Sequence, residues 1–204
     1  MEREWTPLSA RPEGYRSVVV LTGAGVSAAS GLPTYRGPGG LWTADPELAR
    51  SLVAGASLER MWSALGPLRA ALAEVRPNAA HRALADFEAR HVAAGGRFCL
   101  ITQNVDGLHQ AAGSKNVVEY HGSLLRSRCL GACGVIDDRA VHAKPPACPG
   151  CGGPMRPDVV LFEETIGVRQ ERAAKRALDE CDLFVAIGTS GMVWPAASFV
   201  RGAE

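Results

Sequence analysis

Four short groups of polar or glycine residues each follow an apolar run, and they hold the side chains best suited to chemistry. Short apolar runs of this kind are typical of buried parallel strands. Ligands of an open parallel sheet bind outside the carboxyl ends of its strands. We therefore expect the groups to line one crevice; they are Gly23-Ala24-Gly25, Gln103-Asn104-Val105-Asp106, His121-Gly122 and Gly188-Thr189-Ser190.

His121 is the best candidate for acid–base chemistry. An imidazole titrates near pH ~6.5, so a neutral histidine can accept a proton from a hydroxyl at neutral pH. It alone is expected at a strand end, beside a glycine that could admit a substrate. For the other histidines we favour structural or solvated roles; they are His81, His91, His109 and His142.

The first group belongs to a turn suited to phosphate. Gly23, Gly25 and Ala28 fit the dinucleotide fingerprint G-x-G-x-x-[G/A]. The glycines let the backbone turn sharply, and a helix starting over 27–30 would offer free N–H groups to a diphosphate. Any tight strand-to-helix turn fits the same pattern. A dehydrogenase would also place an acidic residue about 20 positions later at a strand end, whereas Asp45 lies in a predicted loop.

The second group offers amide and carboxylate side chains. Gln103, Asn104 and Asp106 suit ribose hydroxyls and a carboxamide. The alternative is that Asn104 and Asp106 only cap the following helix. The residues alone leave both interpretations open.

Four of the six cysteines form two close pairs. Three residues separate Cys129 from Cys133, two separate Cys148 from Cys151, and 14 lie between the pairs. Four thiolates at such spacing are typical of a tetrahedral zinc site with no open position. We therefore predict one structural Zn²⁺. The other two cysteines adjoin apolar strands and fit buried thiols.

The phosphate turn runs directly into Pro33-Thr34-Tyr35-Arg36, and this combination resembles the sirtuins, the NAD-consuming protein-lysine deacylases. The string from Gln103 to Asp106 is similar to the sirtuin segment around the nicotinamide pocket. The resemblance covers Val18 to Ala197 in the family's order. It implies a Rossmann-like NAD domain plus a zinc ribbon, with substrates meeting between them.

The resemblance also implies the roles of single residues. His121 and Asn104 would be catalytic, with Asn104 holding the ribose or a water, and Asp106 would hold the nicotinamide carboxamide. Arg36 would pair with phosphate, and Tyr35, where the family usually has Phe, would cover the ring. The expected NAD contacts are Gly23, Ala24, Gly25, Ser27, Ala28, Pro33, Thr34, Tyr35, Arg36, Trp42, Gln103, Asn104, Val105, Asp106, Gly188, Thr189 and Ser190.

The implied reaction consumes NAD as a co-substrate. The acyl oxygen of a modified lysine attacks the nicotinamide ribose and releases nicotinamide. His121 then deprotonates a ribose hydroxyl, which attacks the resulting imidate, and water completes the transfer to give free lysine and O-acyl-ADP-ribose. Two other functions stay open: an NAD hydrolase or ADP-ribosyltransferase in the same crevice, and a catalytically silent NAD-binding module.

The substrate peptide is expected along Val159, Val160, Leu161 and Phe162. This segment resembles the one with which sirtuins pair an acyl-lysine peptide by strand addition; an ordinary edge strand is the alternative. The family usually has Phe-Gly-Glu here, and this chain has Phe162-Glu163-Glu164.

We expect neutral acyl groups to be preferred. Sirtuins that favour malonyl or succinyl lysine hold the acyl carboxylate with a Tyr-x-x-Arg pair before the Pro-Asn-Ala segment. Those positions fall near Leu65 and Leu68 here, and Arg69 is one residue off the register. A carboxylate at this place would be buried without a partner.

The apolar runs predict an α/β fold, and the resemblance implies a Rossmann-like parallel sheet with helices on both faces and an inserted zinc-ribbon module. We assign 17–123 and 157–204 to the main domain, 124–156 to the module and 1–16 to an irregular arm. Strands are expected at 17–20, 98–102, 116–120 and 183–187. A helical stretch over 45–75 should break at Gly66-Pro67. Further helices should cover 168–181 and follow Asn78, with an apolar face of Ala80, Leu84, Phe87 and His91.

Composition and charge limit the classes of partner that the chain is expected to bind. With 204 residues and 47% hydrophobic residues, the chain can bury one sizeable core and a small module. A net charge of +1 gives no electrostatic basis for binding nucleic acid or an anionic membrane. No apolar run or basic-then-apolar start indicates a membrane span or signal peptide. We predict a cytoplasmic enzyme whose partners are acyl-lysine proteins, with the oligomeric state open.

The end of the sequence carries one more expectation. After Gly188-Thr189-Ser190 a helix should begin, and the sequence stops at Glu204. Sirtuins continue with a strand and loops beside the adenosine. By that resemblance, we expect the 204-residue chain to hold the adenosine half of NAD weakly.

Overall fold

A four-stranded parallel sheet forms the centre of the protein in the computed structural model, which describes residues 12–34, 40, 45–131, 133–191 and 194–201. Its order is β3-β2-β1-β7, formed by Val117–Glu119, Arg97–Thr102, Ser17–Thr22 and Leu183–Ile187. The register pairs Thr22 with Thr102 and Ile187, and Thr102 with Glu119. All four strands therefore end at the same edge, which confirms the predicted parallel sheet.

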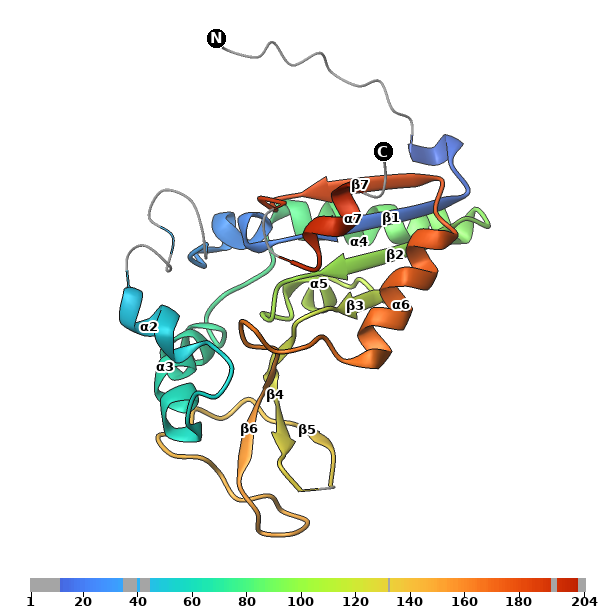
Figure 1. Cartoon of the computed structure of the whole chain (residues 1–204). Helices are drawn as coiled ribbons and strands as arrows, with labels where there is room; N and C mark the ends of the chain where they lie inside the picture. The colour runs from blue at the N-terminus through green and yellow to red at the C-terminus, as the bar shows by residue number, and fades with distance from the viewer. Residues whose placement is uncertain (1–11, 35–39, 41–44, 132, 192–193, 202–204) are drawn as a thin grey trace.

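Helices cover both faces of this sheet, as predicted. Alternate residues of β1 point to opposite faces because side chains alternate along a strand. Val18 and Val20 pack in the cluster that includes Leu84 of α4 (Ala79–Ala93). Val19 and Leu21 pack with Ala174 of α6 (Val168–Asp179) and with Phe199 of α7 (Ala197–Arg201). Figure 1 shows α4 behind the sheet and α6 and α7 in front of it.

The helical stretch before Asn78 differs from the prediction, because α3 (Leu58–Ala71) continues through Gly66-Pro67. The break falls earlier, between α2 (Pro46–Ser51) and α3, where the Ser57 side chain caps α3. The helix tolerates Pro67 because its packing outweighs one lost backbone hydrogen bond. Trp62 is 1% exposed, and its Nε1 donates to the Met155 carbonyl oxygen at 3.0 Å.

Helix α4 begins after Asn78, as predicted, and most of its predicted apolar face is confirmed, because Leu84 and Phe87 pack against the core and His91 is buried. His81, Ala85, Glu88 and His91 are buried, whereas Ala80 is exposed. Polar residues can occupy this face because they have partners. The Glu88 carboxylate accepts from the backbone N–H groups of Lys115 and Asn116 at distances of 2.7 to 3.1 Å, so its oxygens keep hydrogen-bond donors although the residue is buried.

A second, antiparallel sheet of order β5-β4-β6 lies below the first in Figure 1. It consists of β4 (Gly122–Cys129), β5 (Val135–Asp137) and β6 (Met155–Val159). Leu124 and Val159 from this sheet share a core cluster with Leu65 of α3. Strand β4 begins one residue after His121, so His121 lies at the junction of the two sheets.

Short elements complete the described chain: the 3-10 helices η1 (Pro12–Gly14) and η2 (Ala24–Ser30), and α5 (Leu108–Ala111). Among the described residues, no helix combines the length and apolarity needed to cross a membrane.

Candidate active site

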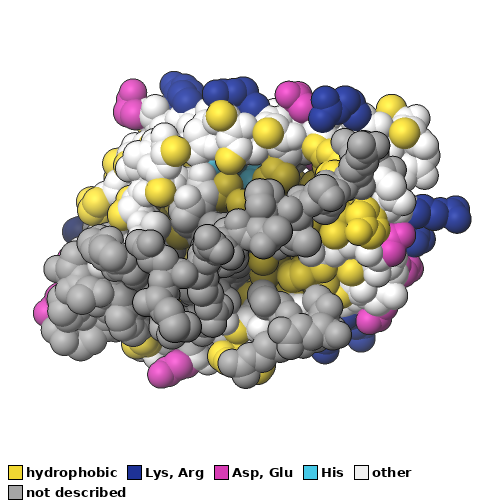
Figure 2. Space-filling model, turned by 90° about the horizontal axis from the view of Figure 1, so that it is seen from above, with side chains coloured by type: hydrophobic (Ala, Val, Ile, Leu, Met, Phe, Trp, Pro, Cys, Tyr) yellow, Lys and Arg dark blue, Asp and Glu magenta, His cyan; other side chains and the backbone are white. Residues whose placement is uncertain are grey.

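One cavity of about 240 Å³ lies at the carboxyl edge of the parallel sheet. All four polar groups of the sequence contribute to its wall. The lining includes Gly23, Ala24, Gly25, Thr34, Gln103, Asn104, Val105, His121, Val159, Val160, Leu161, Phe162, Gly188, Thr189 and Ser190. On the face seen in Figure 2, a histidine is visible among hydrophobic side chains, and the charged side chains lie around the outline of the molecule.

The glycine turn after β1 is fixed by its contact with the loop after β7. Gly25 N donates to the Gly188 carbonyl oxygen at 2.9 Å. A Cβ on Gly25 would lie 2.8 Å from that oxygen, and a Cβ on Gly23 would lie 2.9 Å from it. Such separations are too short for any side chain, so both glycines are needed before any ligand binds. The turn and the loop thus form one continuous wall.

His121 is oriented by a backbone group. Its Nδ1 lies 3.0 Å from the Gln103 carbonyl oxygen, which can only accept, so Nδ1 carries the proton. The other ring nitrogen, Nε2, therefore has a free lone pair. Burial lowers the pKa of His121, although the hydrogen bond to Gln103 raises it in part. The ring is neutral at pH 7 and able to accept a proton.

A buried network orients Asn104. Its Nδ2 donates to Ser27 Oγ at 3.0 Å, and Ser27 Oγ donates to Asp106 Oδ2 at 2.7 Å. Asp106 Oδ1 also accepts from Leu108 N at 2.9 Å, at the start of α5. Asp106 does cap the helix, as one interpretation held, but it also anchors the partner of Asn104. Ser27 and Asp106 lie behind the cavity wall rather than in it.

Two buried histidines support this network from the protein interior. His81 Nδ1 accepts from Asn78 N at 3.3 Å, so its Nε2 donates to Ser27 Oγ at 3.4 Å. His109 Nε2 lies 3.0 Å from Thr22 Oγ1, and the two histidine rings are 4.7 Å apart. Burial, reinforced by His81, lowers the pKa of His109 to about 4. Both histidines are neutral structural groups, as the sequence indicated.

The other side of the cavity holds Gln103 and the segment after β6. Gln103 Nε2 donates to Thr189 Oγ1 at 2.9 Å, which joins the loops after β2 and β7. Val160 N donates to the His121 carbonyl oxygen at 2.9 Å. Phe162 forms a parallel bridge with Val53. Residues 159–162 thus form a wall beside His121, and β6 pairs with β4 rather than with the parallel sheet.

Leu65 extends the cavity as an apolar wall, while Arg69 is directed elsewhere. Leu65 is 4% exposed and lines the cavity. Arg69 Nη2 lies 3.0 Å from Asp138 Oδ1, and Arg69 Nε donates to the Ala140 carbonyl oxygen at 2.6 Å. The Arg69 guanidinium therefore binds the segment that follows β5 in the small antiparallel sheet (β5-β4-β6), and it does not line the cavity.

Some predicted NAD contacts do not line this cavity. Ala28 is exposed, and Pro33 lines a neighbouring cavity between α2 and α3. Tyr35, Arg36 and Trp42 lie outside the described residues. The cavity also has walls that the sequence did not single out for it: Leu52, Glu163, Glu164, Ile166, Trp194 and Pro195.

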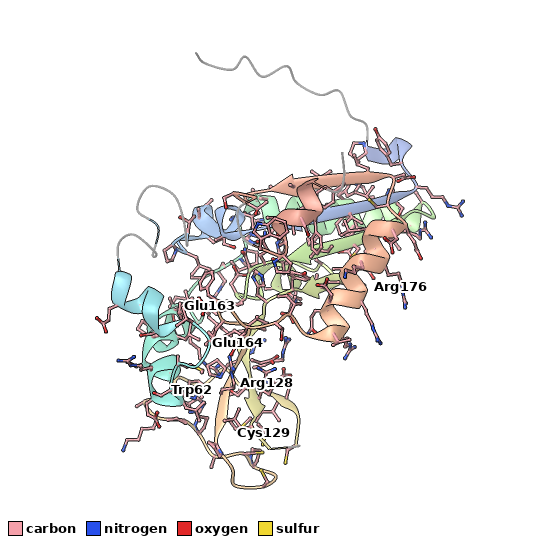
Figure 3. The ribbon with its side chains drawn as sticks, viewed as in Figure 1. Trp62, Arg128, Cys129, Glu163, Glu164 and Arg176 are labelled. Atoms are coloured by element: carbon pink, nitrogen blue, oxygen red, sulfur yellow. The ribbon has the colours of Figure 1, made fainter. Side chains whose placement is uncertain are left out.

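The four paired cysteines converge at the end of the small sheet away from the parallel sheet, where Figure 3 labels Cys129. The sulfur atoms of Cys129, Cys133, Cys148 and Cys151 all lie within 4.8 Å of one another. Tetrahedral Zn–S bonds of ~2.3 Å place thiolates roughly 3.8 Å apart. The geometry fits one closed zinc site, and no disulfide joins these cysteines.

Comparisons with known proteins agree with this geometry. Residues 23–195 match the Sir2 family. The NAD-dependent protein deacylase of Thermus thermophilus is 45% identical over 194 residues, which cover 94% of this chain and 76% of that protein. NAD-dependent protein deacylase 2 of Pyrobaculum aerophilum is 45% identical over 193 residues, covering 93% of this chain and 76% of the relative.

A solved mutant Sir2 homologue in complex with ADP-ribose has the same fold. It superposes with a TM-score of 0.84 at 36% identity, covering 93% of this chain and 76% of that one. The family match begins at Gly23 and ends at Pro195, so it spans most of the chain and includes all four polar groups. The chain therefore belongs to the Sir2 family.

Proposed function

We propose that the protein is an NAD-dependent protein-lysine deacylase that yields free lysine, nicotinamide and O-acyl-ADP-ribose. The observation that carries the proposal is the orientation of His121. Its Nδ1–H is bonded to the Gln103 carbonyl oxygen at 3.0 Å, and its unprotonated Nε2 belongs to a residue that lines the cavity. The family and the deacylase relatives support the same activity.

The chain's residues have separate tasks in the proposed reaction. His121 Nε2 accepts a proton from a ribose hydroxyl, and the Gln103 carbonyl oxygen stabilises the resulting imidazolium. Asn104, held by Ser27, presents its amide oxygen to the ribose or to a water. The wall formed by Gly23–Gly25 and Gly188–Ser190 binds NAD, which supplies the electrophilic sugar carbon.

The peptide is proposed to lie along 159–162, with its acylated lysine extending toward Leu65. Because Leu65 is apolar and Arg69 is bonded to Asp138, this end of the cavity favours an acetyl group over an acidic acyl group. The zinc ion is proposed to hold the small sheet, since four thiolates leave no position open for catalysis. The division at 124–156 and the cytoplasmic location remain our proposals; reduced thiolate quartets are typical of reducing compartments.

The test is to incubate the protein with NAD and an acetyl-lysine peptide, and to identify both products by mass spectrometry. We expect equal amounts of nicotinamide, deacetylated peptide and O-acetyl-ADP-ribose. Nicotinamide release that does not require the peptide would instead identify an NAD hydrolase. ADP-ribosylated protein would identify a transferase, and NAD binding without products would identify a silent binding module.

A further inference from the structure

Glu163 has a backbone conformation that is unusual for its residue type. Its φ is 68°, and it is the one non-glycine residue with positive φ among the described residues. A Cβ makes the left-handed region costly, which is why glycine normally occupies it. The sirtuin pattern described above has glycine at this position. The side chain of Glu163 is therefore present despite an unfavourable backbone.

The surrounding contacts enforce this conformation. Phe162 N donates to the Leu52 carbonyl oxygen at 2.9 Å, which holds the chain before Glu163. After it, Glu164 N donates to the Leu161 carbonyl oxygen at 3.1 Å, and Leu161 N donates to Glu164 Oε2 at 2.9 Å. The turn is thus closed by its neighbours and does not depend on the Glu163 side chain.

The two adjacent carboxylates differ in their charge environment. Glu164 pairs with Arg156, whose Nη1 lies 2.7 Å from Glu164 Oε1. Glu163 is exposed, and no ion pair to it is found in the part of the chain that the structure describes. Figure 3 shows both residues where the chain leaves β6 and passes α3. Glu163 therefore adds a negative charge that none of the observed ion pairs neutralises.

That charge lies beside the proposed peptide segment. Glu163 follows Phe162 directly and lines the same cavity as His121 and Val160. A peptide that adds to a strand is held by backbone hydrogen bonds. The contacts between its side chains and the protein then determine which peptide sequences bind best. Side chains on either side of the acyl-lysine would therefore pass near the Glu163 carboxylate.

We propose that Glu163 is a specificity-determining residue that selects substrate peptides with Lys or Arg next to the acyl-lysine and discriminates against Asp or Glu there. The inference rests on the proposed deacylase function and adds a sequence preference to it. Because Glu163 is exposed, the effect is modest and screened by salt. Replacing a flanking lysine by glutamate should lower kcat/KM about five- to tenfold at low ionic strength, as expected for one attraction lost and one repulsion gained.

The experiment uses three acetyl-lysine peptides that differ only in flanking Lys, Ala or Glu residues. Steady-state kcat/KM at saturating NAD is measured for the wild type, Glu163→Gln and Glu163→Gly, at low and high salt. Glu74→Gln is the matched control, because it removes the same charge from an exposed residue that does not line the cavity. Melting temperatures of all four proteins monitor folding.

We expect the order Lys over Ala over Glu for the wild type and for Glu74→Gln, with a spread that narrows at high salt. Both Glu163 variants should bring the three peptides within twofold of one another. Equal rates on all peptides in the wild type, or an unchanged spread in Glu163→Gln, would overturn the inference while leaving the deacylase proposal intact. Absence of turnover on every peptide would overturn both.

Discussion

Replacing Leu65 by arginine should weaken the enzyme's preference for acetyl-lysine over succinyl-lysine. In the wild type, a succinyl carboxylate would enter an apolar region where Leu65 is 4% exposed and Leu161 is 5% exposed. Arg69 cannot approach it without breaking its pair with Asp138 at 3.0 Å. Desolvating an unpaired carboxylate costs several kcal/mol. Taking about 3 kcal/mol, kcat/KM for succinyl-lysine should be about 150-fold below that for acetyl-lysine.

Leu65→Arg supplies a cation at that wall and should raise the succinyl-to-acetyl ratio of kcat/KM at least about tenfold, the value of one close charge pair. Leu65→Met keeps size and apolarity and should retain the wild-type ratio. The assay follows peptide desuccinylation and deacetylation by mass spectrometry, with melting temperature as a check on folding. Faster desuccinylation by the wild type, or an unchanged ratio in folded Leu65→Arg, would refute the reasoning.

Three further predictions concern pH, the link between α3 and the small sheet, and zinc. Since burial lowers the pKa of His121, kcat/KM should be constant at neutral pH and fall only as pH drops through that pKa, below ~6.5; a decline already beginning above neutrality would contradict this. Arg69→Met should lower the free energy of unfolding in urea by about 2 kcal/mol, because it removes the charged hydrogen bond between the buried guanidinium and the partly buried Asp138 carboxylate; a loss under ~1 kcal/mol would exclude that role. Burial alone would raise the pKa of Asp138, but hydrogen bonds from Ser127 and His142 and the charge of Arg69 lower it, so its contribution is present at neutral pH and lost as pH falls through the folded-state pKa. Metal analysis should give one zinc per active chain, and chelation should unfold the small sheet; active protein without zinc would disprove the structural site.

The parallel sheet could be predicted from sequence because its strands are continuous apolar runs. Leu183–Ile187 was predicted with the bounds that β7 has in the structure. The meeting of the four polar groups followed from one rule about strand ends. The four zinc ligands could also be predicted from sequence, because they lie in two close pairs of cysteines and four thiolates complete a tetrahedral zinc site.

Features that depend on tertiary contacts could not be predicted from the sequence as well. Gly66-Pro67 indicated a helix break, yet packing of Trp62 and Leu65 keeps α3 continuous. The apolar period of α4 identified Leu84 and Phe87 but missed the buried Glu88 and His81, whose polar partners no periodicity reveals. No sequence pattern marked Leu52 as a cavity residue, because its place in the cavity wall depends on the backbone hydrogen bond from Phe162 N to the Leu52 carbonyl oxygen. The strained φ of Glu163 likewise depends on neighbours distant in sequence.

The most direct test of the account is the His121→Ala variant, measured for deacetylation and for NAD binding on the same preparation. Removing a general base should lower kcat for deacetylation about 10²- to 10⁴-fold. NAD affinity by calorimetry should stay within about threefold of wild type, because the glycine walls and the Asn104 network do not depend on the His121 side chain. Turnover at the wild-type rate in folded His121→Ala would contradict the central claim, and His121 would have to be removed from the mechanism.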